Sequence, residues 1–220
     1  MISHSKEKIL LFAVAMTILF SMTFSSCTAD EELVQKPVSD DYLQVAREVL
    51  QDSIVLNATA MMGTVNKTLL DEGCPLKYYL EWRGQDTLNI QIKEFCVGKM
   101  PVTVWFSANC KFMQLNSWEK QEYTEEGWIK FQATGGKTYY TGNGNDVDDS
   151  YEDGSGGAGT VVGYFNAKTN DIEFVTNFNV MNMSSDVFLQ KIDLTRMDRF
   201  EADFAEYEKK LAEYKENQGK

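Results

Sequence analysis

Histidine is almost absent from this sequence. The chain of 220 residues has one histidine, His4, and it lies in an amino-terminal segment that we expect to be cleaved off. The remaining chain then has no imidazole for a Ser-His-Asp or Cys-His mechanism, and none to ligate zinc. Carboxylate pairs can catalyse hydrolysis, as in glycosidases, but no spacing among the 33 acidic residues singles out a pair. The sequence therefore predicts a protein that is not an enzyme and has no cofactor.

Positive charge is scarce too. The chain has 21 lysines and arginines against 33 acidic residues, a net charge of −12. Nucleic-acid binding depends on clustered Lys and Arg that neutralise phosphates. The composition therefore argues against nucleic acid as a partner.

The chain also lacks an apolar run long enough to span a bilayer comfortably, which takes about 20 residues. Lys6 and Lys8 precede an apolar run from Ile9 to Phe20, and small and polar residues then lead to Cys27. A charged start, a short apolar centre and a small-residue end are typical of a secretory signal. We predict that residues 1–26 are a cleaved signal.

The end of this signal resembles a lipid-attachment site. Phe24-Ser25-Ser26-Cys27 is similar to the lipobox of bacterial lipoproteins, although Phe24 replaces the usual leucine, as in the relaxed boxes of Bacteroidota lipoproteins. The resemblance implies diacylglycerol and a fatty acyl chain, such as palmitate, on Cys27, and so a stable anchor in the outer membrane. Residues 27–38 would be the tether. Asp30-Glu31-Glu32 resembles the surface-export signal of that phylum; alternatively, these acids only solvate the tether.

Cysteine is sparse, with three residues besides Cys27: Cys74, Cys96 and Cys110. Three thiols outside the cytoplasm could form one disulfide. Cys96 and Cys110 share a face of the hairpin predicted below but lie too far apart along it for a bridge. We expect all three to be small buried residues, with a bridge to Cys74 as the alternative.

What the sequence has in abundance is alternation of apolar and polar residues. From Thr87 to Cys110, two alternating runs flank the turn residues Gly98 to Pro101, which predicts a β-hairpin. In it Leu88, Ile90, Ile92 and Cys96 share one face. Similar runs cover Ser53–Met62, Leu76–Arg83, Phe112–Trp118, Gly127–Ala133, Thr160–Phe165, Asp171–Val180 and Asp186–Ile192. About 8–10 short strands indicate a mainly β fold, an antiparallel barrel or sandwich.

Two helices complete this single domain, which we place at residues 39–220. A short one follows a cap at Ser39. At about residues 195–216 the period changes to 3.6, with an apolar stripe that predicts an amphipathic carboxyl-terminal helix. We expect this helix to pack on its own barrel; the alternative is the groove of a protein partner.

The segment 142–159 is rich in glycine and acid and has no positive charge. Carboxylates in a flexible loop suit Ca²⁺, and the candidate ligands are Asp146, Asp148, Asp149 and Asp153. The spacing fails the EF-hand pattern. We favour a solvated excursion between two strands.

The segments TLNIQIKEFCVGKMPVTVWF and GTVVGYFNAKTNDIEFVTNFNV resemble the calycin-like β-barrel lipoproteins of Bacteroides and relatives, families mostly of unknown function. The resemblance implies a lipocalin-like barrel that binds a small apolar ligand. Small barrels either hold one ligand or fill with side chains. The candidate cavity residues are Ile90, Val104, Phe106, Phe174 and Phe178.

A second functional class remains open, a surface accessory or adhesion module that contacts glycan or protein through exposed aromatics. The candidates are Trp105, Trp118, Trp128, Tyr139, Tyr140 and Tyr151, and the alternative is that most are cross-strand packing pairs. An open apolar interior would favour ligand binding, and a filled interior would favour the accessory module.

Two triplets resemble the O-glycosylation sites of exported Bacteroidota proteins, with Ser53 and Thr87 as the acceptors. Both triplets lie where a turn meets a strand, so the alternative is local turn bonding.

Overall fold

The computed structural model describes residues 37–142, 152–153, 158–180, 183–191 and 196–218. The predicted signal 1–26, Cys27 and most of the tether lie outside the described residues. Within the described part, no helix is long and apolar enough to cross a membrane.

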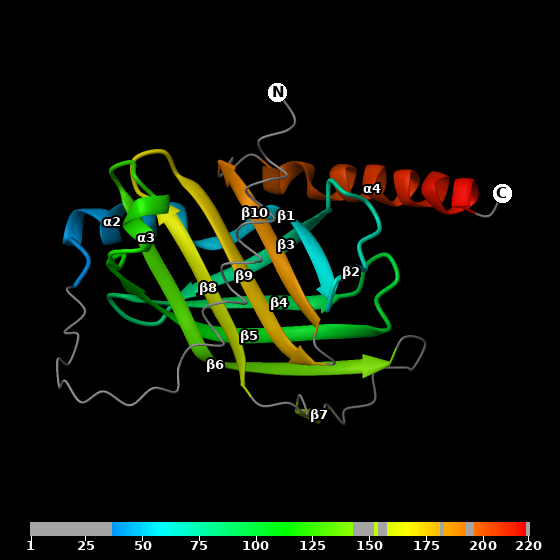
Figure 1. The fold of residues 1–220 in the computed structure, drawn as a ribbon, viewed down its shortest axis with the longest axis horizontal. Helices are drawn as coiled ribbons and strands as arrows, with labels where there is room; N and C mark the ends of the chain where they lie inside the picture. The colour runs from blue at the N-terminus through cyan, green and yellow to red at the C-terminus, as the bar shows by residue number, and fades with distance from the viewer. Residues whose placement is uncertain (1–36, 143–151, 154–157, 181–182, 192–195, 219–220) are drawn as a thin grey trace. The chain divides into compact units, whose positions relative to one another are not determined.

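One antiparallel sheet of ten strands forms the body of the described chain (Figure 1). The strands are β1 (Asp52–Met62), β2 (Val65–Asn66), β3 (Cys74–Trp82), β4 (Thr87–Phe95), β5 (Val102–Met113), β6 (Trp128–Gly142), β7 (Glu152–Asp153), β8 (Gly159–Asn166), β9 (Asp171–Val180) and β10 (Met183–Lys191). Their order is β10-β9-β8-β6-β5-β4-β3-β1-β2, with β7 beside β6. The predicted mainly β antiparallel fold is confirmed.

The sheet curls until its ends meet, because Ala58–Met62 of β1 pair with Met183–Val187 of β10. Register shifts help to bend it; among them, one extra residue lies in β4 between Ile92 and Phe95 and one in β6 between Gln132 and Lys137. Extra residues of this kind increase the local twist and bend of a strand. The result is a β-barrel shell and not a flat sandwich.

The predicted hairpin is confirmed, with Leu88 opposite Cys110. The predicted face of Cys96 is wrong. Glu94 has a φ of 53°, and the shift between Ile92 and Phe95 turns Phe95 into the core and leaves Cys96 exposed. Cys74 and Cys110 are buried thiols, as expected.

The predicted strand Phe112–Trp118 is also wrong beyond its first two residues. Asn116 Oδ1 accepts the backbone N–H groups of Trp118 and Glu119, both at 2.9 Å, and the Glu119 carboxylate accepts the Asn116 N–H at 2.8 Å. This reciprocal capping box stabilises a helix start. It introduces the short helix α3 (Glu119–Glu122). The next strand, β6, continues nine residues past the predicted end at Ala133, to Gly142.

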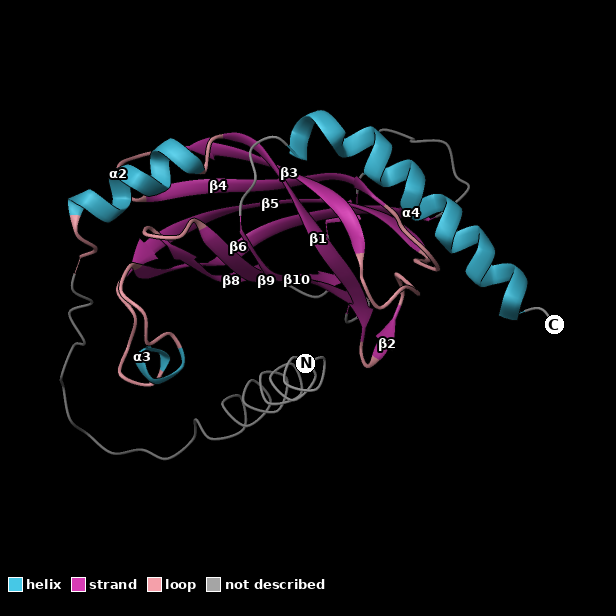
Figure 2. Cartoon of the chain, turned by 90° about the horizontal axis from the view of Figure 1, so that it is seen from above, coloured by secondary structure: helices cyan, strands magenta, loops and turns pink. Residues whose placement is uncertain are grey.

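Two longer helices lie at opposite ends of the shell (Figure 2). Helix α2 (Asp40–Val49) adds Leu43 and Ala46 to the core. Trp82 Nε1, from β3, donates to the carbonyl of Leu50 at 2.7 Å just after this helix. The helix begins after Ser39, as predicted, although the Ser39 side chain makes no cap hydrogen bond.

Helix α4 (Arg196–Gln218) packs against β1 and β3. Tyr207 and Leu211 of its apolar stripe are buried in the main core, and the Tyr207 hydroxyl donates to the carbonyl of Thr68 at 3.1 Å. The prediction that this helix packs on its own barrel is therefore confirmed.

A candidate binding groove beside the carboxyl-terminal helix

The interior of the shell is packed with aromatic rings at the positions predicted to line a cavity. Ile90, Val104, Phe106, Phe174 and Phe178 are each at most 2% exposed. The ring centroid of Phe178 lies 5.5 Å from that of Phe106 and 6.0 Å from that of Phe95, and those of Phe174 and Tyr78 are 4.9 Å apart. These spacings are those of direct aromatic contact. The five residues predicted to line a cavity therefore belong to the packed core.

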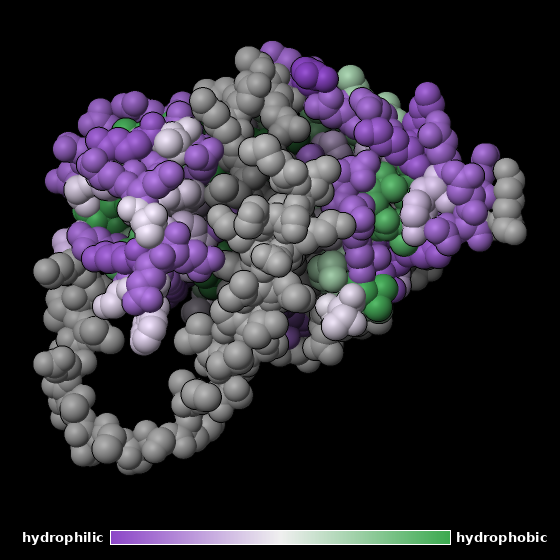
Figure 3. Space-filling view, turned by 45° about the horizontal axis from the view of Figure 1, so that its top comes forward, coloured by the Kyte–Doolittle hydropathy of each residue, from purple (hydrophilic) through white to green (hydrophobic). Residues whose placement is uncertain are grey.

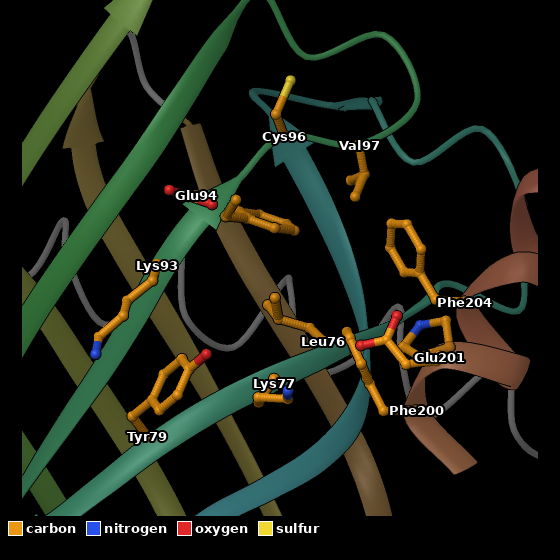
Figure 4. A pocket seen from close by; sticks show the side chains of 12 residues that line it. Leu76, Lys77, Tyr79, Lys93, Glu94, Cys96, Val97, Phe200, Glu201 and Phe204 are labelled. Atoms are coloured by element: carbon orange, nitrogen blue, oxygen red, sulfur yellow. The ribbon is translucent and has the colours of Figure 1, made fainter. Parts of the chain in front are cut away.

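A groove of about 260 Å³ lies between α4 and the strands β3 and β4 (Figure 4). Its lining comes from three parts of the chain far apart in sequence: Pro75, Leu76, Lys77, Tyr79, Lys93, Glu94, Phe95, Cys96, Val97, Phe200, Glu201 and Phe204. Leu76 and Val97 are buried and Phe204 packs partly against the core, so the groove has an apolar floor beneath a charged rim.

The bulge at the end of β4 forms one wall of this groove. It exposes Glu94 and Cys96 while Phe95 and Val97 are buried. The following turn is held in place because the Lys99 N–H donates to the carbonyl of Lys67 at 2.8 Å and the Met100 N–H to that of Val97 at 2.9 Å. Bulges re-aim side chains in this way at many functional sites.

The rim carries two lysines, each over an aromatic ring. Lys77 Nζ lies 4.6 Å from the ring centroid of Phe200, and Lys93 Nζ lies 4.2 Å from that of Tyr79. Both distances fit cation–π contacts, which orient an ammonium group without neutralising its charge. The groove therefore combines apolar, aromatic and charged groups, which is the composition of a small-ligand site.

A second cluster, centred on Tyr123, Tyr164 and Glu119, lies apart from the main core and anchors the loop that contains α3. The Tyr123 hydroxyl donates to Glu173, the Tyr164 hydroxyl to Glu119 Oε1 at 3.1 Å, and Lys130 pairs with the same oxygen at 2.6 Å. Burial raises the pKa of both tyrosines. Burial also raises the pKa of Glu173, against the lowering effect of the Tyr123 hydrogen bond. The acidic groups bond to neighbouring side chains, so we interpret this cluster as structural.

Of the proposed calcium ligands, Asp146, Asp148 and Asp149 lie outside the described residues, and Asp153 is in β7. Among the residues that the structure does describe, no group of three His, Cys, Asp or Glu side chains could hold a metal ion. This finding does not test the prediction that residues 142–159 form a solvated loop.

The proposed contact aromatics differ in exposure. Trp118 is 77% exposed, on the loop before α3. Trp105 and Tyr139 are half-buried cross-strand partners and Trp128 contacts Tyr123, as the packing alternative expected. Tyr140 is half-buried, and Tyr151 lies outside the described residues. In the view of Figure 3 hydrophilic side chains dominate the coloured surface, and the hydrophobic ones form small patches.

The two predicted glycosylation acceptors are both half-buried. Ser53 lies in β1 opposite Tyr79. The Thr87 hydroxyl donates to Asp86 Oδ1 at 3.1 Å, which is the local turn bonding expected as the alternative. Glycosylation of either residue stays a prediction.

The cysteines give a direct test of the bulge. In the purified chain with Cys27→Ser, one thiol, Cys96, is expected to react with a disulfide reagent at about pH 8, because its side chain is exposed. Burial raises the pKa of Cys74 and Cys110 to about 12, so that only roughly one in ten thousand is a thiolate at that pH. Mass spectrometry of peptides identifies the site. Rapid labelling of Cys110 in the folded chain would contradict the described core.

The geometry defines a class, a curled antiparallel β-barrel protein with a groove between its last helix and the sheet. The chain belongs to the family described as Domain of unknown function (DUF4903), whose family model matches residues 27–219. No curated protein and no solved structure matches it. The family match and the barrel support part of the calycin-like resemblance, whereas Bacteroidota origin and lipoprotein status stay predictions.

The sequence did not point to the groove. The sequence pattern placed Lys77, Tyr79 and Lys93 only on the outer face of two predicted strands. It placed Phe200 only in the apolar stripe of the predicted helix. The one available signal was that apolar stripe of the last helix. It begins at Met197 and Phe200, before the buried residues Tyr207 and Leu211.

Proposed function

We propose that this chain is a lipid-anchored binding protein of the cell envelope that takes up a small apolar or amphipathic ligand in the α4 groove. The observation that carries the proposal is the contrast between the two candidate sites. The interior positions are in ring-to-ring contact, whereas the groove is open and has an apolar floor. This contrast supports a ligand site outside the packed shell and not among the interior rings.

The lipid anchor is supported by the sequence order that ends at Cys27 and by the extent of the family match. That match begins at Cys27 and leaves out the predicted signal. Since a diacylglycerol group plus an acyl chain exceeds what stable membrane attachment needs, the domain would be held at the membrane by its tether.

Cys27→Ser is expected to release the chain from the membrane fraction or to leave an unprocessed precursor, because serine cannot form the thioether to the lipid. Fractionation of cells, with intact mass of the purified protein, measures both outcomes. Cys96→Ser is the matched control and is expected to change neither. Unchanged mass and partitioning of Cys27→Ser would rule out the anchor.

The ligand site is tested with phenyl-naphthylamine, a neutral fluorescent apolar probe. Phe200→Gln replaces a half-buried groove residue and is expected to weaken probe binding roughly tenfold, which corresponds to about 1.4 kcal/mol. Phe178→Leu changes the interior and is expected to leave probe binding unchanged while it lowers stability. Fluorescence titration of the full chain measures the affinity, and thermal melting shows whether each variant is folded.

The opposite pattern would favour the barrel interior, with Phe178→Leu altering the affinity and Phe200→Gln leaving it unchanged. An absence of saturable binding in the unaltered chain would remove the small-ligand proposal. The second candidate function, contact with a protein or glycan, is favoured by the filled interior. It would then rest on Trp118, because its side chain is 77% exposed and exposed tryptophans often dominate interfaces.

A further inference from the structure

The structure describes ion pairs for some lysines, but not for the two that line the groove. Several described lysines pair with a carboxylate, including Lys111, Lys130, Lys168 and Lys210. Within the described residues, the ion pairs include neither Lys77 nor Lys93. Their ammonium groups lie over Phe200 and Tyr79 instead.

The two lysines lie toward the same end of the groove (Figure 4). Figure 4 shows Tyr79 between Lys93 and Lys77, away from Val97 and Cys96 at the other end. Glu94 and Glu201 also line the groove, and no described ion pair joins either of them to a lysine. With two lysines and two glutamates, the lining has a formal net charge of zero, so a preference for anions depends on where the lysines lie.

The apolar part of the groove starts next to these lysines. Lys77 and Leu76 are neighbours in β3 and both line the groove, so the charged rim and the apolar floor are one residue apart. Phe95 and Val97 continue the floor on the β4 side, and Phe204 closes it from α4. This arrangement matches a ligand with an acidic group at one end and an apolar body at the other.

The volume limits the size of that ligand. The groove holds about 260 Å³, or roughly nine water molecules at about 30 Å³ each. Ligand pockets for drug-sized molecules usually measure about 300–1,000 Å³. The groove therefore suits a compact molecule, such as one with fused rings or a short chain, and is too small for a long-chain lipid.

We propose that the ligand of the α4 groove is a small amphipathic organic anion, with its acidic group held by Lys77 and Lys93 and its apolar part on Leu76, Val97 and Phe204. This inference rests on the proposed function of the same groove and adds the charge of the ligand. The lysines supply selectivity for an anion, and the apolar floor supplies the main part of the affinity.

The test compares two probes with the same type of aromatic body, anilinonaphthalene sulfonate, which is an anion, and the neutral phenyl-naphthylamine. The full chain is expected to bind the anion about tenfold more tightly. Lys93→Met keeps an unbranched apolar side chain of nearly the same length and is expected to weaken anion binding about fivefold, with little effect on the neutral probe. Lys93→Arg is expected to restore it. Raising the salt concentration is expected to weaken anion binding alone.

Lys77→Met provides a second variant with the same expectation, in case one lysine also supports the fold. Lys111→Met is the matched control, since this exposed lysine on β5 pairs with Asp86 and does not line the groove. It is expected to change the binding of neither probe. Thermal melting of each variant shows that it is folded.

Three outcomes are decisive. Selective loss of anion binding in the two groove variants supports the inference. Equal affinity for both probes, or equal losses in the lysine variants, overturns the anion preference and leaves the groove as a neutral apolar site, so the proposed function stands. Absence of saturable binding of both probes removes the inference and the small-ligand function together.

Discussion

Replacing Phe174 with alanine is expected to lower the free energy of unfolding by about 3–5 kcal/mol, as truncation of a buried phenylalanine does. Phe174 is 2% exposed, and its ring centroid lies 4.9 Å from that of Tyr78 and 5.7 Å from that of Phe131. The Cβ of a residue other than glycine at position 163 would lie 2.4 Å from Phe174 Cβ, so backbone and rings already pack tightly there. Chemical denaturation measures the loss.

Phe200→Ala is the matched control because it removes the same ring from a half-buried site on α4. Its cost is expected to be well under half that of Phe174→Ala, since little of the packing around it is internal. If Phe174→Ala lost no more stability than Phe200→Ala, the interior would contain an open cavity, and the lipocalin-like reading would return.

Gly98→Ala is expected to cost about 3 kcal/mol or more. Gly98 has a φ of 58°, and an added Cβ would lie 2.0 Å from the carbonyl oxygen of Lys67. The left-handed conformation costs a residue with a Cβ about 1–2 kcal/mol, and forcing atoms into a packed site costs about 1–3 kcal/mol more. The obstructing atom is backbone, so relief requires the turn to move away from Lys67. Denaturation with the same method measures this loss.

Gly63→Ala separates the two causes. Gly63 has a φ of 60°, and an added Cβ would meet nothing within 4 Å. It should therefore show the conformational cost alone, about 1–2 kcal/mol. Similar losses for the two variants would mean that the turn after β4 shifts freely, and the groove wall that it supports would not be fixed.

Alternation was enough to predict the hairpin around Thr87 to Cys110, because a strand with one buried face must repeat every two residues. It failed at Cys96 because one residue, Glu94, adopts a positive φ and shifts the register. The predicted strand from Phe112 to Trp118 was wrong for another reason. Asn116 and Glu119 have the spacing of a capping box, which could have been read as a helix start.

The groove could not be predicted from the sequence, for a different reason. Lys77, Lys93 and Phe200 are brought together only when α4 packs across β3 and the bulge turns the end of β4. Local periodicity specifies which face of each element is apolar, but not the position of a helix along the strands that it covers. The expected packing of the helix on the barrel was confirmed, and its placement created the site.

The pairing of β1 with β10 has a consequence for how the protein folds. Two segments from nearly opposite ends of the domain must meet before the shell is closed, and such distant pairings raise the contact order and slow folding. Until β10 arrives, the backbone groups at Ala58–Met62 are an unpaired edge that can associate with other chains. Loss of the last strand, by truncation or proteolysis, would thus convert this shell into a template for aggregation.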